Sequence, residues 1–217
     1  MRYIHAIIVL TLLLLLMSCK GQENIPRESG ELTAKDTLDA IAKQSALEEE
    51  MLRDSTWVDP GLKTGKTPEG LSFTPQKDRN MNNYLEISVG DNTDVVVKLV
   101  SRKTDKCIRY VYVKGNDTYP ITNIPQGLYY LKIGYGKNWR QKEIDGKIVG
   151  KFLSNAQYEI GTETLDYNIS YGSTEYTDEG SYQNYSIPSY SVSLNVVQFA
   201  TLNSFETDTI SESEFNE

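Results

Sequence analysis

Residues 84–101 read YLEISVGDNTDVVVKLVS, and the alternation of apolar and polar side chains in this stretch indicates a β-hairpin. Apolar side chains occupy every second position of its first half, at Leu85, Ile87 and Val89. Successive side chains of a strand point to opposite faces of a sheet, so this spacing places the three on one buried face. A turn is expected at residues 90–93 and a second strand at residues 94–101.

The alternation continues beyond this hairpin in short segments that are separated by turn residues. Further strands are expected over residues 107–113, 119–122, 128–135, 165–171 and 190–196. Six or seven short strands without strand–helix–strand alternation indicate an antiparallel sandwich and argue against a parallel α/β sheet. We therefore predict an all-β fold with one β-sandwich domain over residues 84–199, which is long enough for a single hydrophobic core.

The chain begins with a short apolar run between Arg2 and Cys19. A spanning helix needs about 20 apolar residues, so this shorter run is interpreted as a secretory signal peptide over residues 1–18. It closes with Leu16-Met17-Ser18-Cys19, which resembles the lipobox of bacterial lipoproteins. The resemblance implies cleavage before Cys19 and acylation of that cysteine, with chains of the palmitate kind holding the mature chain on a membrane. An uncleaved N-terminal anchor and a plain secretion signal remain alternatives.

The polar residues after the cysteine, Lys20-Gly21-Gln22-Glu23-Asn24, resemble the start of mature lipoproteins of the Bacteroidota. This resemblance implies a location in the bacterial cell envelope, at the outer membrane, and leaves both the periplasmic and the surface-exposed face open. The membrane is therefore an expected partner, through the Cys19 lipid anchor.

Polar segments flank the predicted domain on both sides. Residues 19–83 carry scattered prolines and glycines and little apolar area to offset the entropy of ordering, so we expect a flexible tether. Within it, apolar residues three or four positions apart predict one helix over residues 36–54, either a spacer helix or a docking helix for a partner. Residues 200–217 contain acidic residues and no lysine or arginine, which predicts a disordered acidic tail.

The composition excludes several classes of function. The single histidine, His5, lies in the predicted signal peptide, so the mature chain has none for a catalytic triad, a Cys-His pair or a histidine zinc site. Cys107 is the one thiol left after lipidation and is interpreted as a small buried residue. A net charge of −8 without a basic patch makes nucleic acid an unexpected partner. We predict no catalytic residues, no metal site and no cofactor.

The aromatic residues are the candidates for a contact surface. Fifteen tyrosines stand against five phenylalanines, and they gather in residues 110–135 and 158–190. Tyrosine rings pack well while their hydroxyl groups meet water, which suits half-buried strands as well as binding platforms. Trp139 is the first candidate, in a predicted loop over residues 136–139, although it can also plug one end of the sandwich. The other candidates for ligand or partner binding are Tyr135, Asn138 and Tyr129.

Four motifs carry the one resemblance at the level of the domain. They are VVKLV at 96–100, RYVYV at 109–113, IPQGLYYLK at 124–132 and GKNW at 136–139. They resemble a bacterial β-domain family in which a Val-Pro-x-Gly-x-Tyr turn and a Gly-Lys-Asp-Trp loop recur; Asn138 stands at the aspartate position. The strand order is similar to that of prealbumin-like modules such as carboxypeptidase regulatory domains. The resemblance implies a prealbumin-like sandwich over residues 84–199, and it brings no activity and no catalytic residues.

Two functions of different kinds follow as hypotheses. The first is a non-enzymatic envelope lipoprotein that displays its β-sandwich to bind a protein partner or to scaffold an envelope complex. The alternative is a carbohydrate-binding module in which Trp139 and nearby tyrosines stack on sugar rings. Exposed, coplanar rings would support the alternative, and buried rings would contradict it. A third hypothesis, a glycosidase, needs two carboxyl groups about 5–10 Å apart in a cleft.

Overall fold

The computed structural model describes residues 34–53, 56–69, 74–197 and 200–217. In these ranges the chain forms twelve strands and two helices. In chain order they are α2 (Ala34–Arg53), β1 (Tyr84–Val89), β2 (Asp94–Ser101), β3 (Cys107–Val113), β4 (Thr118–Thr122), β5 (Leu128–Ile144), β6 (Lys147–Gly161), β7 (Leu165–Asp166), β8 (Ser170–Thr177), β9 (Gly180–Ser186), β10 (Tyr190–Val197), β11 (Ala200–Asn203), β12 (Thr207–Thr209) and α3 (Glu212–Asn216).

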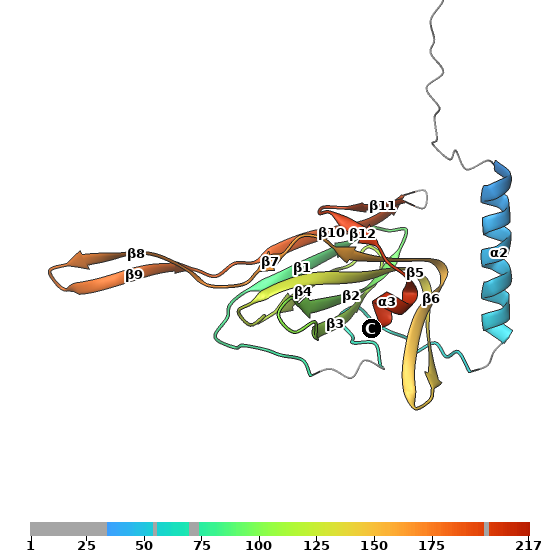
Figure 1. Ribbon diagram of the computed structural model, residues 1–217, viewed down its shortest axis with the longest axis horizontal. Coiled ribbons are helices and arrows are strands. Elements are labelled where there is room, and N and C mark those ends of the chain that lie inside the picture. Colours follow the sequence, from blue (N-terminus) through green and yellow to red (C-terminus); the bar gives the residue numbers. More distant parts are fainter. Residues whose placement is uncertain (1–33, 54–55, 70–73, 198–199) are drawn as a thin grey trace, which may run out of the picture. The chain divides into compact units, whose positions relative to one another are not determined.

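Two packed sheets form the body of the domain (Figure 1). The smaller sheet has the order β11-β10-β1-β4, and the larger has the order β12-β6-β5-β2-β3, with β7 paired to β5. The prediction of an all-β sandwich is confirmed. One detail differs, because β1 and β10 run parallel while the other pairs in both sheets are antiparallel.

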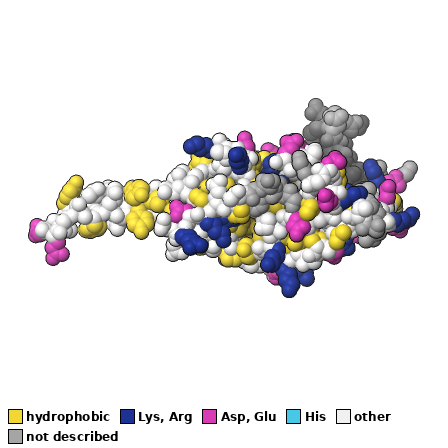
Figure 2. Space-filling model, turned by 90° about the horizontal axis from the view of Figure 1, so that it is seen from below, with side chains coloured by type: hydrophobic (Ala, Val, Ile, Leu, Met, Phe, Trp, Pro, Cys, Tyr) yellow, Lys and Arg dark blue, Asp and Glu magenta, His cyan; other side chains and the backbone are white. Residues whose placement is uncertain are grey.

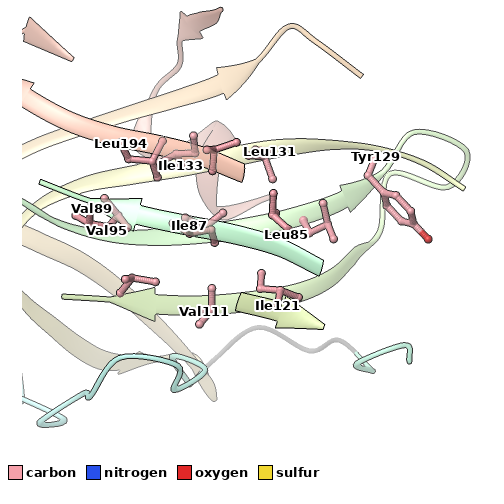
Figure 3. Packing of buried hydrophobic residues seen from close by; sticks show 14 of the residues in the cluster. Leu85, Ile87, Val89, Val95, Val111, Ile121, Tyr129, Leu131, Ile133 and Leu194 are labelled. Carbon is pink, nitrogen blue, oxygen red and sulfur yellow. The ribbon is translucent and has the colours of Figure 1, made fainter. Parts of the chain in front are cut away.

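The hydrophobic core lies between these two sheets, as the alternation in residues 84–101 predicts. Leu85, Ile87 and Val89 of β1 face Leu131 and Ile133 of β5 across the core (Figure 3). The other members of this cluster with sticks labelled in the same view come from β2, β3, β4, β5 and β10; they are Val95, Val111, Ile121, Tyr129 and Leu194.

A second apolar cluster covers the opposite face of the larger sheet. Strand β2 is buried along almost its whole length, so both of its faces are covered. Val96 points to the second cluster, whereas its neighbours Val95 and Val97 point to the core between the sheets. The remaining buried members of the second cluster are Tyr110, Tyr112, Trp139, Phe152, Tyr158 and Phe215. Segments outside residues 84–199 therefore help to cover this face.

The C-terminal segment is one of these covers, and the prediction of a disordered acidic tail is wrong. Residues 200–217 form β11, β12 and α3. The side chain of Phe215 is 0% exposed and packs in the second cluster. A capping box starts α3: the Ser211 side chain accepts from the Glu214 backbone N–H, and the Glu214 carboxylate accepts from the Ser211 N–H. The acids of this segment stay at the surface while one aromatic ring anchors it.

The last part of the predicted tether is the other cover, so the tether does not extend to residue 83. The Gly65 N–H donates to the Tyr112 carbonyl oxygen at 2.9 Å, and the Tyr112 N–H donates to the Lys66 carbonyl oxygen at 2.8 Å. These bonds satisfy part of the free edge of β3, which otherwise ends the larger sheet. Further along, Met81 is buried. The folded body therefore begins well before Tyr84.

Helix α2 spans Ala34–Arg53 and matches the helix predicted over residues 36–54. Its described apolar side chains Leu38 and Ile41 are exposed. Among the described residues, no helix is long and apolar enough to cross a membrane. The predicted signal peptide over residues 1–18, with Cys19, lies outside the described residues.

Candidate functional site

The β8–β9 hairpin is the candidate functional site. Among the described strands, these two pair only with each other and form a sheet of their own, which Figure 1 shows as a two-stranded ribbon following β7. Every residue of both strands is exposed. We call residues 170–186 the arm. Since its residues are exposed, the arm adds nothing to the hydrophobic core, and packing of the core does not explain why it is there. A two-stranded hairpin without a packed face is only marginally stable in water.

The arm presents four tyrosines to solvent. Their exposed fractions are 64% for Tyr171, 84% for Tyr176, 50% for Tyr182 and 63% for Tyr185. Between them lie glycine, serine, threonine, asparagine, glutamine and acidic residues, and residues 170–186 contain no aliphatic side chain. The tyrosine rings are therefore the whole apolar surface of the arm.

A β-bulge gathers three of these tyrosines on one face. Tyr171 lies directly opposite Tyr185, with ring centroids 6.4 Å apart and planes inclined by 50°. The register shifts between Tyr171 and Thr174, where β8 carries one extra residue. Tyr171 and Tyr176 are five positions apart and would point to opposite faces of a regular strand. The extra residue brings Tyr176, opposite Ser181, onto the face of Tyr171 and Tyr185.

The other face of the arm is more polar. Tyr182 lies opposite Glu175, and its hydroxyl group donates a hydrogen bond to the Glu175 carboxylate. This bond raises the pKa of Tyr182, because it stabilises the protonated phenol next to a negative charge. At the tip, Asp178 and Glu179 form the turn with Gly180, whose φ of +145° suits glycine. Figure 2 shows acidic side chains in magenta at the end of the arm and hydrophobic ones in yellow along it.

The arm lies within a segment whose charged side chains are all acidic. Residues 152–217 contain no lysine and no arginine. They contain eleven acidic residues, namely Glu159, Glu163, Asp166, Glu175, Asp178, Glu179, Glu206, Asp208, Glu212, Glu214 and Glu217. The basic residues of the chain all precede this segment, so the arm carries tyrosine rings and negative charge without a cation of its own.

Trp139, the first candidate for a contact surface, is buried instead. Its side chain is 5% exposed and meets Phe152 edge to face, with ring centroids 4.9 Å apart. A Cβ atom at Gly150 would lie 2.2 Å from Cζ2 of Trp139, so the glycine leaves room for the indole. The residues 136–139 predicted as a loop belong to β5, which continues through a register shift between Tyr135 and Lys137.

The two tyrosines proposed beside Trp139 are buried as well. Tyr135 is 0% exposed, and its hydroxyl group donates to Asn203 Oδ1 at 2.8 Å. Burial raises the pKa of Tyr135 above its ordinary value. Tyr129 packs edge to face on Tyr167, and its hydroxyl group donates to the Pro125 carbonyl oxygen at 3.1 Å. These rings build the core, and the structure does not join them into an exposed platform.

Asn138 is the one exposed member of the predicted site. It adopts a positive φ of 58°, a conformation that asparagine tolerates better than most residues. Its side-chain amide donates to Ser154 Oγ at 3.2 Å, across the β5–β6 pair. A local backbone role explains this residue, so of the four predicted binding residues none contributes an exposed ring.

Sequence reasoning missed the arm for an identifiable reason. Tyrosines are common in half-buried strands, so the high number of tyrosines between Tyr158 and Tyr190 did not show which of them lie in the core and which at the surface. The strand predicted over residues 165–171 is also interrupted: Asp166 Oδ1 accepts from the Asn168 N–H at 2.9 Å and ends β7. The useful signal was the absence of aliphatic residues from 170–186, because strands of that composition cannot face an apolar core.

Two further kinds of site, a reactive thiol and a metal centre, find no support in the described part of the body. Burial raises the pKa of the Cys107 thiol to about 11, which disfavours a reactive thiolate near neutral pH. In the part of the chain that the structure describes, no three histidine, cysteine, aspartate or glutamate side chains are placed to hold a metal ion together. Comparison with protein families, with curated proteins and with solved structures finds no match to this chain.

Proposed function

We propose that this protein is a non-catalytic lipoprotein of the bacterial cell envelope that binds a protein partner through the arm. One observation carries the proposal: the arm is a fully exposed two-stranded hairpin with Tyr171, Tyr176 and Tyr185 on one face. The sandwich then serves as the rigid support from which the arm is displayed.

The physical argument rests on what the arm lacks. Within the described ranges, each of its strands has one edge without a strand partner. Neither strand has the lysines or prolines that protect exposed edges. A strand of another protein can pair with such an edge through main-chain hydrogen bonds, while side chains on the face set specificity. Tyrosine is enriched at the centres of protein interfaces, since its ring buries a large area at low entropic cost.

A carbohydrate-binding function fits the same surface less well. The platform first considered for sugars, Trp139 with Tyr135 and Tyr129, is buried. The exposed rings of Tyr171 and Tyr185 are inclined by 50° to each other, whereas a flat platform for sugar rings needs nearly coplanar ones. Binding of a glycan to the arm is therefore an outcome that the experiment must be able to report.

Removing the arm is expected to abolish partner binding and leave the fold intact. The Tyr190 hydroxyl group donates to the Asp166 carbonyl oxygen at 2.9 Å, so the chain segments on either side of the arm lie close together. A short Gly-Ser linker can therefore replace residues 170–186. The melting temperature should change by no more than about 2 °C, because the replaced side chains are exposed. Circular dichroism checks the fold.

Photo-crosslinking in cells tests partner binding directly. A photoreactive phenylalanine analogue at position 176 should give a discrete adduct with another protein. The same analogue at Tyr84, a half-exposed tyrosine of β1, is the matched control and should give none. Adducts that persist from body positions after the arm has been replaced would contradict the proposal, and glycan-array binding that is lost with the arm would favour the carbohydrate function.

The same proposal assigns a lipid anchor to Cys19, supported by the Leu16-Met17-Ser18-Cys19 motif. Cys19→Ser is expected to move the protein from the membrane fraction to the soluble fraction and to abolish palmitate labelling. Each buried CH₂ group of an acyl chain contributes about 0.8 kcal/mol, so loss of two or three chains removes stable anchoring. Cys107→Ser is the control and should stay on the membrane, while a labelled Cys19→Ser protein would refute the anchor.

A further inference from the structure

We propose that the arm recognises a cationic, arginine-containing segment of its partner protein. This inference rests on the proposed function and adds the chemical class of the partner. It is argued from the tyrosine face, from the charge of residues 152–217 and from how cations meet aromatic rings elsewhere in this chain.

The tyrosine face offers the geometry that a guanidinium group uses. Tyr171 and Tyr185 lie side by side across the hairpin, and Tyr176 lies further along the same face, towards the tip. A planar guanidinium stacks on the negative face of an aromatic ring and keeps its N–H groups available for hydrogen bonds. Spaced rings of this kind suit an extended segment that carries cations at alternate positions.

Cations already lie over aromatic rings on the body of the protein, where the Tyr130 ring is buried and the Trp57 ring is half-exposed. The Arg102 guanidinium lies 5.1 Å from the ring centroid of Tyr130. The Lys151 and Lys142 ammonium groups lie 4.7 Å and 5.7 Å from the Trp57 ring centroid. Among the described residues, none of these cation–ring contacts involves a tyrosine of the arm. In the part of the chain that the structure describes, the rings of the arm have no cation over them and are open to a cation from another molecule.

The negative charge of the arm favours the same class of partner, a cationic segment. Glu175, Asp178 and Glu179 give the arm three negative charges, and the whole segment 152–217 has no positive charge to offset them. This field attracts a basic segment and repels an acidic one, including the arm of a second copy of this chain. It also repels anionic lipid head groups. A basic protein segment is the partner class that satisfies both the rings and the charges.

Peptide binding to the full-length lipoprotein in detergent micelles tests the proposal. The probes are a decapeptide with alternating arginine and serine, its lysine counterpart and its glutamate counterpart. Thermophoresis with fluorescent peptides gives each Kd. The arginine peptide should bind most tightly, the lysine peptide more weakly and the glutamate peptide not at all. Raising the salt concentration from about 0.05 to 0.5 M should weaken binding, because exposed charges are screened.

Variants of the two faces separate recognition from a general charge effect. The triple variant Tyr171→Ser, Tyr176→Ser, Tyr185→Ser should raise the Kd of the arginine peptide about tenfold. Tyr182→Ser, on the opposite face, is the matched control and should change it less than about twofold. The double variant Asp178→Asn, Glu179→Gln should weaken binding and reduce its salt dependence, with Asp91→Asn in the β1–β2 turn as its control.

Equal binding of the arginine and glutamate peptides, or a triple variant that binds like the unaltered protein, would overturn the inference. Concentration-dependent self-association through the arm would overturn it in favour of a second copy. A photo-adduct from position 176 that is insensitive to salt, with no binding of the arginine peptide, would leave the proposed function standing and remove the cationic partner. Absence of both the adduct and peptide binding would remove both.

Discussion

Phe215→Ala is expected to lower the free energy of unfolding by about 3–4 kcal/mol. The Phe215 ring is fully buried and lies 5.2 Å from the Tyr158 ring and 6.4 Å from the Tyr110 ring, measured between centroids. Truncation to alanine leaves a cavity in a cluster that the short helix α3 cannot refill by itself. Urea or guanidinium denaturation followed by circular dichroism measures the loss.

Leu202→Ala is the matched control for this experiment. Leu202 belongs to the same C-terminal segment and is 57% exposed, so its truncation should cost less than about 0.5 kcal/mol. If Phe215→Ala also cost less than about 0.5 kcal/mol, residues 211–217 would not be docked on the sheet, and the result would support the disordered tail expected from the acidic composition.

The pKa of Lys98 gives a second measurement of how Phe215 packs. Its ammonium group lies 4.4 Å from the Phe215 ring centroid and donates to the Phe215 carbonyl oxygen. Burial lowers the pKa of Lys98 to about 8 from the ordinary 10.5. Water reaches the amine once the ring is removed, so the pKa of Lys98 should rise in Phe215→Ala. An NMR titration of the lysine side chains follows this change independently of stability.

Trp139→Ala is expected to lower the free energy of unfolding by about 3–5 kcal/mol and to leave partner binding by the arm unchanged. The indole fills the space above Gly150 and packs edge to face on Phe152. Its Nε1–H has no hydrogen-bond partner among the described residues, so truncation breaks no hydrogen bond of the indole and the expected loss comes from packing. Trp139→Phe keeps most of the ring and should cost less than half as much.

Asn138→Gly is the control for Trp139→Ala. It removes the neighbouring exposed side chain at a positive φ that glycine adopts freely, so we expect a change of less than about 0.5 kcal/mol. A Trp139→Ala protein of unchanged stability that had lost binding to a glycan or protein would contradict the structural role and restore Trp139 as a contact residue.

Much of the sandwich was predictable because its information is local. Leu85, Ile87 and Val89 alternate with polar residues, and the register of β1 puts all three in the core. The run Val95–Val97 carried a further signal, since a strand with apolar residues on both faces must be covered on both. That signal indicated a second layer over β2 without saying which segments supply it.

The candidate site was only partly predictable from the sequence. Tyrosine is equally suited to core and surface, so its density could not separate the buried Tyr135 from the exposed Tyr176. The bulge that places Tyr176 beside Tyr171 and Tyr185 depends on how β8 pairs with β9. Strand register is a property of the pair, and neither strand alone specifies it.

By itself, the sequence determined the all-β class, the positions of β1, β2, β3, β4 and β10, the first part of β5, helix α2 and the absence of histidine chemistry from the chain after His5. These follow from side-chain periodicity and composition, which act over a few residues. Only the tertiary structure decided that residues 200–217 are folded, that part of residues 56–83 caps an edge strand, and that Trp139 is core while residues 170–186 form an arm. In each case distant segments decide the outcome. Phe215 is buried because β3 and β6 provide Tyr110 and Tyr158, and the arm is exposed because none of the segments that the structure describes covers it.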